Sequence, residues 1–137
     1  MPKRIDHVAI IVRSIEQALA FYRDTLGILP SEIKDVPSEQ VRIVFLPMGG
    51  PGGSEIELIE PTTPTSSLTK FLEKRGEGLH HICLEVENID AALQEMKDKG
   101  APVLDEQPRV AAEGRAIFLH PKGTNGVLLE LIEKEDQ

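Results

Sequence analysis

The sequence RIDHVAIIVRSIEQALAFYRDTLGI at residues 4–28 determines the architecture, because a related sequence, GLHHICLEVENIDAALQEMKDKGAP, follows at residues 78–102. Residue 4 matches residue 78, and equivalent positions carry the same or similar residues. The matched pairs are His7/His81, Val8/Ile82, Ile10/Leu84, Val12/Val86, Ile15/Ile89, Ala18/Ala92, Leu19/Leu93 and Gly27/Ala101. Further on, RIVFLP (42–47) matches RAIFLHP (115–121), and IELIE (56–60) matches LELIE (129–133). The chain is therefore two copies of one module.

Each copy predicts the same order of elements. A β-branched, apolar strand (HVAIIV or HICLEV) comes first, and an amphipathic helix follows it. Ser14 and Asn88 are expected to cap the starts of these helices, and Gly27 and Gly100 to end them. The expected strands are 41–47 and 55–60 in copy one and 115–120 and 127–133 in copy two, with short strands at 30–36 and 102–106. The module is thus βαβββ, and SLTKFLEKRG predicts a linking helix.

Strand geometry predicts which side chains share a face. Neighbouring residues of a strand point to opposite sides, and the bulkier apolar set of each opening strand should pack under its helix. His7 and His81 alternate with that set, so they are expected on the helix-free face. The same alternation places Glu57 and Glu130 on that face.

Each copy therefore supplies one histidine and one glutamate. A single glutamate on a strand is usually just solvated, but both residue types recur at equivalent positions. If the modules pack about a local twofold, the four side chains converge on one metal ion. The predicted ligands are His7, Glu57, His81 and Glu130. Two imidazoles and two carboxylates suit a divalent ion, with Co²⁺ as first choice and Ni²⁺, Mn²⁺ or Zn²⁺ as alternatives.

These elements predict an α+β fold in which two tandem βαβββ modules form a curved mixed sheet around a metal cleft. The chain is expected to be a single domain over residues 1–137. Module one covers 1–61, the linker helix 62–77 and module two 78–137. Exposed sheet edges predict a homodimer.

Composition excludes several classes of protein. Hydrophobic residues make up 40% of the chain and charged residues 28%, as in ordinary soluble proteins. Lys3, Arg4 and Asp6 interrupt any apolar leader and no apolar run is long, so a cytoplasmic protein without membrane contact is expected. A net charge of −8 argues against nucleic-acid binding. The single cysteine, Cys83, rules out an internal disulfide and is expected to be a small buried hydrophobe.

Several motifs resemble the vicinal oxygen chelate superfamily: the opening DH, the central LHH and the closing LLEL. Within it, nearly the whole chain is similar to the methylmalonyl-CoA epimerase family, in RIDHVAI, KFLEKRGEGLHHICLEVENIDAAL, DEQPRV and FLHPKGTNGVLLEL. This resemblance implies a metal-dependent isomerase that interconverts (R)- and (S)-methylmalonyl-CoA. The reaction removes the proton at carbon 2 through a metal-stabilised enolate, and an acyl-CoA is the small-molecule partner.

The resemblance also implies roles for residues. The ligand positions correspond to the four named above, although family members also carry glutamine at the position of Glu57. Glu130 is implied as a ligand and proton shuttle. Some members carry the second base as a glutamate on the strand VRIVFL, where this chain has Arg42 and Ile43. Glu57 is the second catalytic candidate, with Glu55 and a metal-bound water as alternatives.

Two other functions stay open. The set His-Glu-His-Glu also resembles bacterial glyoxalase I, which needs the same enolate stabilisation. A non-catalytic member that sequesters a drug or other ligand is the third reading, although such binders often lack a complete ligand set.

Four further residues have weaker assignments. His80 points away from His81 and is expected either to be structural or to support a ligating residue. His120 either lines the cleft or caps a turn. Arg109 and Lys122 are candidates for contacts with CoA phosphates.

Overall fold

The computed structural model describes residues 1–135, which divide into two compact units. No helix within these residues is long and apolar enough to cross a membrane. The first-repeat unit is His7–His80, and the second-repeat unit joins Met1–Asp6 to the chain from His81 onward. The first six residues thus go with the second repeat, whereas the sequence assigned them to the first module. The organisation as a single domain stays a prediction.

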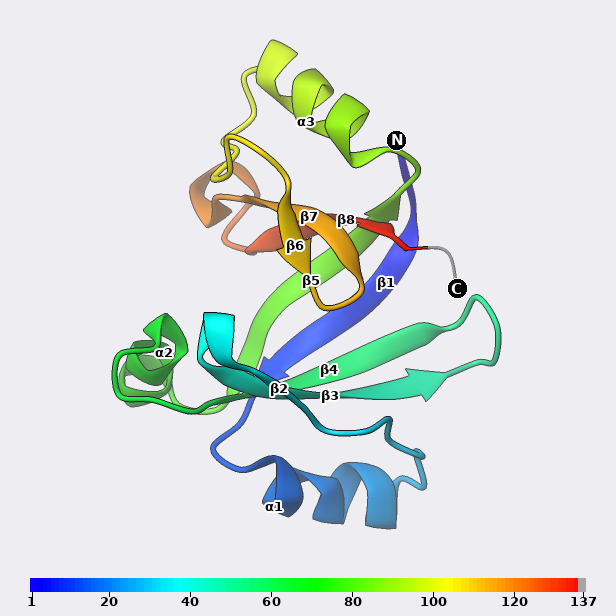
Figure 1. The fold of residues 1–137 in the computed structure, drawn as a ribbon, viewed down its shortest axis with the longest axis vertical. Helices are drawn as coiled ribbons and strands as arrows, with labels where there is room; N and C mark the ends of the chain where they lie inside the picture. The colour runs from blue at the N-terminus through cyan, green and yellow to red at the C-terminus, as the bar shows by residue number, and fades with distance from the viewer. Residues whose placement is uncertain (136–137) are drawn as a thin grey trace. The chain divides into compact units, whose positions relative to one another are not determined.

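The first-repeat unit has the order of elements expected of one module. Its elements are β1 (Pro2–Ile11, from His7 onward), α1 (Ile15–Leu19), η1 (Ala20–Thr25), β2 (Lys34–Val36), η2 (Pro37–Glu39), β3 (Val41–Met48), β4 (Ser54–Pro61) and α2 (Ser67–Arg75). Strand β4 is parallel to β1 and antiparallel to β3, and β3 is antiparallel to β2. The strand order is β2-β3-β4-β1 (Figure 1).

The second-repeat unit repeats this scheme. Its elements are the start of β1, β5 (Gly78–Val86, from His81 onward), α3 (Ile89–Asp98), β6 (Arg109–Ala111), β7 (Gly114–Leu119), η3 (Pro121–Gly123) and β8 (Leu129–Lys134). Strand β8 is parallel to β5 and antiparallel to β7, which is antiparallel to β6. The strand order is β1-β5-β8-β7-β6 (Figure 1).

Both helices that follow an opening strand begin where the sequence predicts. Helix α3 ends at Asp98, two residues before Gly100, whereas α1 ends at Leu19 and η1 continues the helical segment to Thr25. The Ser14 hydroxyl and the Asn88 side-chain oxygen each accept a hydrogen bond from a backbone N–H three residues on, at 3.2 and 2.9 Å. Gly27 and Gly100 have φ of 77° and 70°, a conformation that disfavours side chains. The π-helical turn η1, which continues α1, was not predicted.

The apolar interior of the first-repeat unit lies on both faces of its strands. Under α1, Ile15 and Leu19 pack against Val12, Val44, Leu46 and Leu58. This confirms that the bulkier strand set lies beneath the helix. The opposite face buries Ala9, Val41, Ile43, Phe45 and Ile59, and Leu68 of α2 packs against them. The face of His7 is therefore not free of helices, because the linking helix covers part of it with an apolar side chain.

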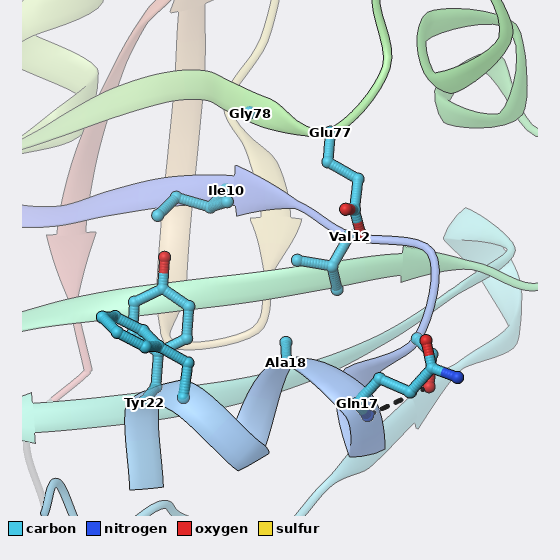
Figure 2. A pocket seen from close by; sticks show the side chains of 9 residues that line it. Ile10, Val12, Gln17, Ala18, Tyr22, Glu77 and Gly78 are labelled. Carbon is cyan, nitrogen blue, oxygen red and sulfur yellow. Dashed lines mark hydrogen bonds between the residues drawn. The ribbon is translucent and has the colours of Figure 1, made fainter. Parts of the chain in front are cut away.

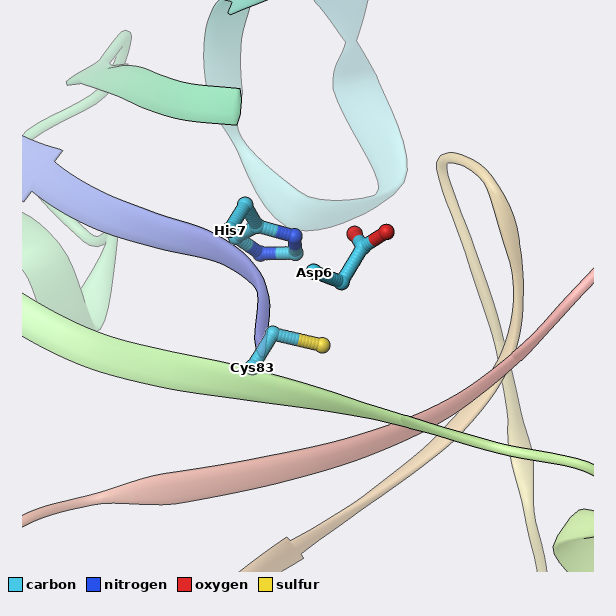
Figure 3. A group of neighbouring side chains, drawn as sticks. All are labelled: Asp6, His7 and Cys83. Atoms are coloured by element: carbon cyan, nitrogen blue, oxygen red, sulfur yellow. The ribbon is translucent and has the colours of Figure 1, made fainter. Parts of the chain in front are cut away.

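The second-repeat unit has two matching clusters. Below α3, Ile89, Ala92 and Leu93 pack with Val86, Ile117 and Leu131. On the other face, Cys83, Ala116 and Ile132 form a small buried cluster. Cys83, labelled in Figure 3, is fully buried in this cluster, which confirms the expectation of a buried apolar residue.

The strand predicted at 102–106 is wrong. Only Val103 makes an isolated bridge there, to Leu119, and the short strand of the second copy is β6 instead. The Asp105 carboxylate accepts a hydrogen bond from the backbone N–H of Phe118 at 2.6 Å, in place of a backbone carbonyl. The backbone pairing of residues 102–106 with β7 therefore ends at the Asp105 side chain. The apolar pattern of these residues did not predict this.

Candidate functional site

The first-repeat unit brings His7 and Glu57 together. His7 lies on β1 and Glu57 on the parallel strand β4, and His7 Nε2 is 3.4 Å from Glu57 Oε1. Both side chains are buried, with residue exposures of 4% and 8%. The ring of Phe45, opposite Glu57 on β3, meets the imidazole edge-on at 6.1 Å between centroids. The prediction that this histidine and glutamate share a face is confirmed.

The second-repeat unit builds the same pair from His81 and Glu130. His81 Nε2 lies 3.1 Å from Glu130 Oε1, and both residues are buried. Phe118, opposite Glu130 on β7, meets the imidazole edge-on at 5.3 Å. The histidine, glutamate and phenylalanine are thus repeated in kind and in position, and the second shared-face prediction is also confirmed.

Each pair fits two ligands of a divalent ion. Ligand atoms that lie about 2.0–2.2 Å from one ion, at roughly tetrahedral to octahedral angles, are about 3–3.5 Å apart. The Nε2–Oε1 distances of 3.4 and 3.1 Å lie in this range. That both pairs share one ion stays a prediction.

Glu130 also has a cationic neighbour, Arg109 of β6. Arg109 Nη2 donates a hydrogen bond to Glu130 Oε2 at 3.1 Å. Its guanidinium lies 4.1 Å from the ring centroid of Phe118, and its Nε is 3.6 Å from Asp105 Oδ1. The sequence suggested Arg109 for CoA phosphates, but the structure places it against a predicted metal ligand. The sequence did not predict this contact.

Arg42 lies on the opposite face from Glu57. It pairs with Glu60 at 3.3 Å and with Glu16 of α1 at 2.5 Å. These hydrogen bonds and charges raise the pKa of Arg42, and the bond from Arg42 lowers the pKa of Glu16. Ile43, which does share the face of Glu57, is buried among apolar residues. Strand β3 therefore brings an apolar side chain, Ile43, to the site face and turns its charged neighbour Arg42 away from it.

The remaining histidines have local partners. His80 meets the ring of Phe71 in α2 edge-on at 5.2 Å, in agreement with a structural role. The Nδ1 of His120 accepts a hydrogen bond from the backbone N–H of Lys122 at 3.0 Å, at the start of η3. Of the two alternatives for His120, the structure therefore supports the turn cap.

A cavity of about 360 Å³ lies on the helix side of the first-repeat unit. Figure 2 shows Ala18 and Tyr22 from the helical segment facing Ile10 of β1 and Val12, which follows the strand, and Glu77 also lines the cavity. Ile10 and Val12 alternate with His7 along the strand, so the cavity is on the face away from His7 and Glu57. It is not part of the candidate site.

The residue before His7 is buried and charged. Asp6, drawn beside His7 in Figure 3, is fully buried and accepts hydrogen bonds from Lys134 at 2.8 Å and Arg4 at 3.2 Å. Arg4 also reaches Glu85 of β5 at 3.2 Å. This charge cluster belongs to the second-repeat unit and ties the start of β1 to β5 and β8.

Comparison with known proteins identifies the family. Residues 6–119 match the Glyoxalase/Bleomycin resistance protein/Dioxygenase superfamily. Mitochondrial methylmalonyl-CoA epimerase of Mus musculus is 42% identical over 130 residues, which cover 93% of this chain and 71% of the mouse chain. The ethylmalonyl-CoA/methylmalonyl-CoA epimerase of Cereibacter sphaeroides is 43% identical over 131 residues, which cover 93% and 96%.

A solved structure gives the same result for the fold. A variant of Streptomyces coelicolor methylmalonyl-CoA epimerase, in complex with 2-nitronate-propionyl-CoA, superposes with a TM-score of 0.92 at 36% identity. The match covers 99% of this chain and 100% of the other. The predicted fold class and the predicted family are both confirmed. The chain belongs to the glyoxalase/bleomycin resistance protein/dioxygenase superfamily and, within it, to the methylmalonyl-CoA epimerases, which are isomerases.

Proposed function

We propose that this protein epimerises methylmalonyl-CoA at carbon 2, with His7, Glu57, His81 and Glu130 as ligands of one divalent ion. The observation that carries the proposal is the duplication of a buried donor pair. Each unit holds one imidazole nitrogen and one carboxylate oxygen 3.1–3.4 Å apart. One pair offers too few ligands for a typical protein-bound ion, whereas two pairs supply four. The acyl-CoA substrate is proposed from the epimerases named above.

Epimerisation removes the proton at carbon 2 from one side and returns a proton on the other. Removal leaves negative charge on the thioester oxygen, near the carboxylate of the substrate. When bound, a divalent ion supplies Lewis-acid stabilisation of that developing charge and orients the substrate.

The side chains of this chain then have distinct tasks. His7 and His81 would hold the ion through Nε2. Phe45 and Phe118 pack against the two imidazole edges and limit their rotation. In the proposal Glu130 exchanges a proton with carbon 2 on one side of the substrate, and Glu57 does so on the other. A proton taken by one carboxylate is matched by a proton given by the second, so the substrate is recovered with inverted configuration.

Exchange of the carbon-2 proton with solvent tests the proposal. Protein loaded with Co²⁺ in D₂O should incorporate deuterium at carbon 2 of methylmalonyl-CoA, and chelator-treated protein should lose this activity. A loaded protein that produces no exchange contradicts the proposal. The glyoxalase alternative predicts instead that the hemithioacetal of methylglyoxal and glutathione is isomerised to a thioester. The same preparation tests both reactions.

Three finer features stay predictions: cobalt as the native ion, a homodimer and a cytoplasmic location. Nitrogen and oxygen ligands support cobalt but also suit nickel, manganese and zinc. Elemental analysis of protein purified without added metal identifies the ion. Sedimentation of the same sample gives the oligomeric state.

A further inference from the structure

The two carboxylate oxygens of Glu130 face different partners. Oε1 lies 3.1 Å from His81 Nε2, and Oε2 lies 3.1 Å from Arg109 Nη2. Each of the two carboxylate oxygens therefore has a partner. Because a charge-assisted hydrogen bond from a planar guanidinium is strong and directional, Arg109 restricts rotation of the carboxylate about its last side-chain bond.

Arg109 is itself held in place. Its guanidinium stacks on Phe118 at 4.1 Å, and its Nε lies 3.6 Å from the Asp105 carboxylate. Asp105 in turn accepts a hydrogen bond from the backbone of Phe118. Since the ring of Phe118 also meets His81, the side chains of His81, Glu130, Arg109 and Phe118 form a closed ring of contacts. A displacement of any one of them is resisted by the next.

The first repeat has a different residue at the equivalent position. Arg109 lies opposite Ala116 in the β6–β7 ladder, and Lys34 lies opposite Ile43, the counterpart of Ala116, in the β2–β3 ladder. Lys34 is exposed, whereas Arg109 is half-buried. A lysine ammonium is a point charge without the planar fork of a guanidinium. The repeat thus conserves the histidine, glutamate and phenylalanine and changes the basic residue.

We propose that Arg109 is a positioning residue that makes Glu130 a one-oxygen ligand. By donating a hydrogen bond to Oε2, it leaves Oε1 as the atom presented beside His81 Nε2. A carboxylate oxygen has two lone pairs, so this hydrogen bond is compatible with proton transfer at Oε2 in the proposed reaction. This inference rests on the proposed function, because it assumes that Glu130 binds the ion. Arg109 is not one of the four proposed ligands, so the ligands alone do not reveal its role. Because of this residue, the ligand pair of the second repeat would be held more rigidly than the pair of the first.

Cobalt binding tests the role without relying on turnover. Metal-free wild-type protein, Arg109→Met, Arg109→Lys and the matched control Lys34→Met are titrated with Co²⁺, and affinity and visible absorption are recorded. Loss of an outer partner of a metal ligand typically weakens metal binding about 10–100-fold. Arg109→Met should show a loss of this size and a changed cobalt absorption band. Arg109→Lys should recover only part of the affinity, and Lys34→Met should match wild type.

The outcomes separate the two proposals. Wild-type protein that binds no Co²⁺ overturns the proposed function and this inference with it. Wild-type binding, with unchanged affinity and absorption in Arg109→Met, overturns this inference alone. If Arg109→Lys has the full Co²⁺ affinity of wild type, this inference is also overturned, because a positive charge without the planar guanidinium would then be enough. Thermal unfolding of each variant shows whether it is folded. If Arg109→Met does not fold, the comparison of Arg109→Lys with wild type decides the question.

Discussion

The carboxylate of Glu60 accepts a hydrogen bond at 2.9 Å from the backbone N–H of Ile15, the first residue of α1. The second repeat makes the same contact, since Glu133 accepts from the N–H of Ile89 at 2.9 Å. The first N–H groups of a helix have no partner within it and carry partial positive charge. A carboxylate from the last strand of each module therefore fixes the start of the helix that follows the first strand.

Replacing Glu60 should lower stability measurably. Glu60→Ala leaves the N–H of Ile15 without its carboxylate and removes one partner of Arg42. We expect the free energy of unfolding to fall by about 1–2 kcal/mol, the usual contribution of a helix cap with a favourable charge. Urea unfolding measures the change, with Glu73→Ala, an exposed glutamate on α2, as the control. Equal stability of the two variants would contradict the assigned role.

Acid should weaken the ion pair between Arg115 and Asp90. Arg115 donates to both oxygens of Asp90 at 3.0 Å, and this hydrogen bonding lowers the pKa of Asp90. A carboxyl whose pKa is lower in the folded state stabilises the fold above its unfolded pKa and loses that contribution as pH falls through its folded pKa. An NMR titration should therefore show a higher pKa for Asp90 in Arg115→Gln than in wild type. The same pKa in both proteins would mean that the pair does not persist in solution.

Most of the fold could be predicted because the signal is local and repeated. Alternation along β1 and β5 assigned each side chain to a face, and the caps at Ser14 and Asn88 fixed the helix starts. The predictions that were wrong depend on contacts between residues that are distant in the sequence. Asp105 replaces a ladder carbonyl, and Leu68 reaches a face that its position in the linking helix did not indicate.

The candidate site could be predicted only in part. Recurrence of a histidine and a glutamate in both copies identified the two donor pairs, which the structure brings together within each unit. The contact of Arg109 with Glu130 could not be predicted, because it depends on where the three-residue strand β6 lies beside β7. The available signal was weak: a basic residue occurs on the corresponding short strand of each copy, at Lys34 and Arg109.

Histidine variants test whether the two pairs bind one ion. His7→Ala and His81→Ala each remove one nitrogen ligand from a different unit. If the ion is shared, wild type should hold one ion per chain and either variant should lose most of it, because three ligands bind far more weakly than four. Elemental analysis after gel filtration measures the content. His80→Ala is the control, because His80 packs on Phe71 and points away from His81 along the strand.

The stoichiometry distinguishes a shared ion from independent sites. Two ions per wild-type chain, falling to one in either histidine variant, would mean that each pair binds its own ion. Unchanged content in all three variants would remove the histidines from the ligand set.

Glutamine variants on β4 locate the second base. Glu57→Gln keeps a side-chain oxygen that can bind the ion but removes the group that can take a proton. We expect metal content to be retained and epimerisation to fall by about 10²–10⁴-fold, the usual contribution of a general base. Glu55→Gln changes a glutamate two residues away, on the same face of the same strand, and should leave epimerisation near the wild-type rate.

Deuterium exchange from each epimer separately makes this test directional. With Glu57 replaced and Glu130 intact, the epimer whose carbon-2 proton faces Glu130 should still exchange, while the other should not. Loss of exchange from both epimers would mean that Glu57 serves binding and not proton transfer. A loss in Glu55→Gln, with Glu57→Gln unaffected, would assign the second base to Glu55, because the two carboxylates lie on one face of β4 and only the one within reach of carbon 2 can transfer its proton.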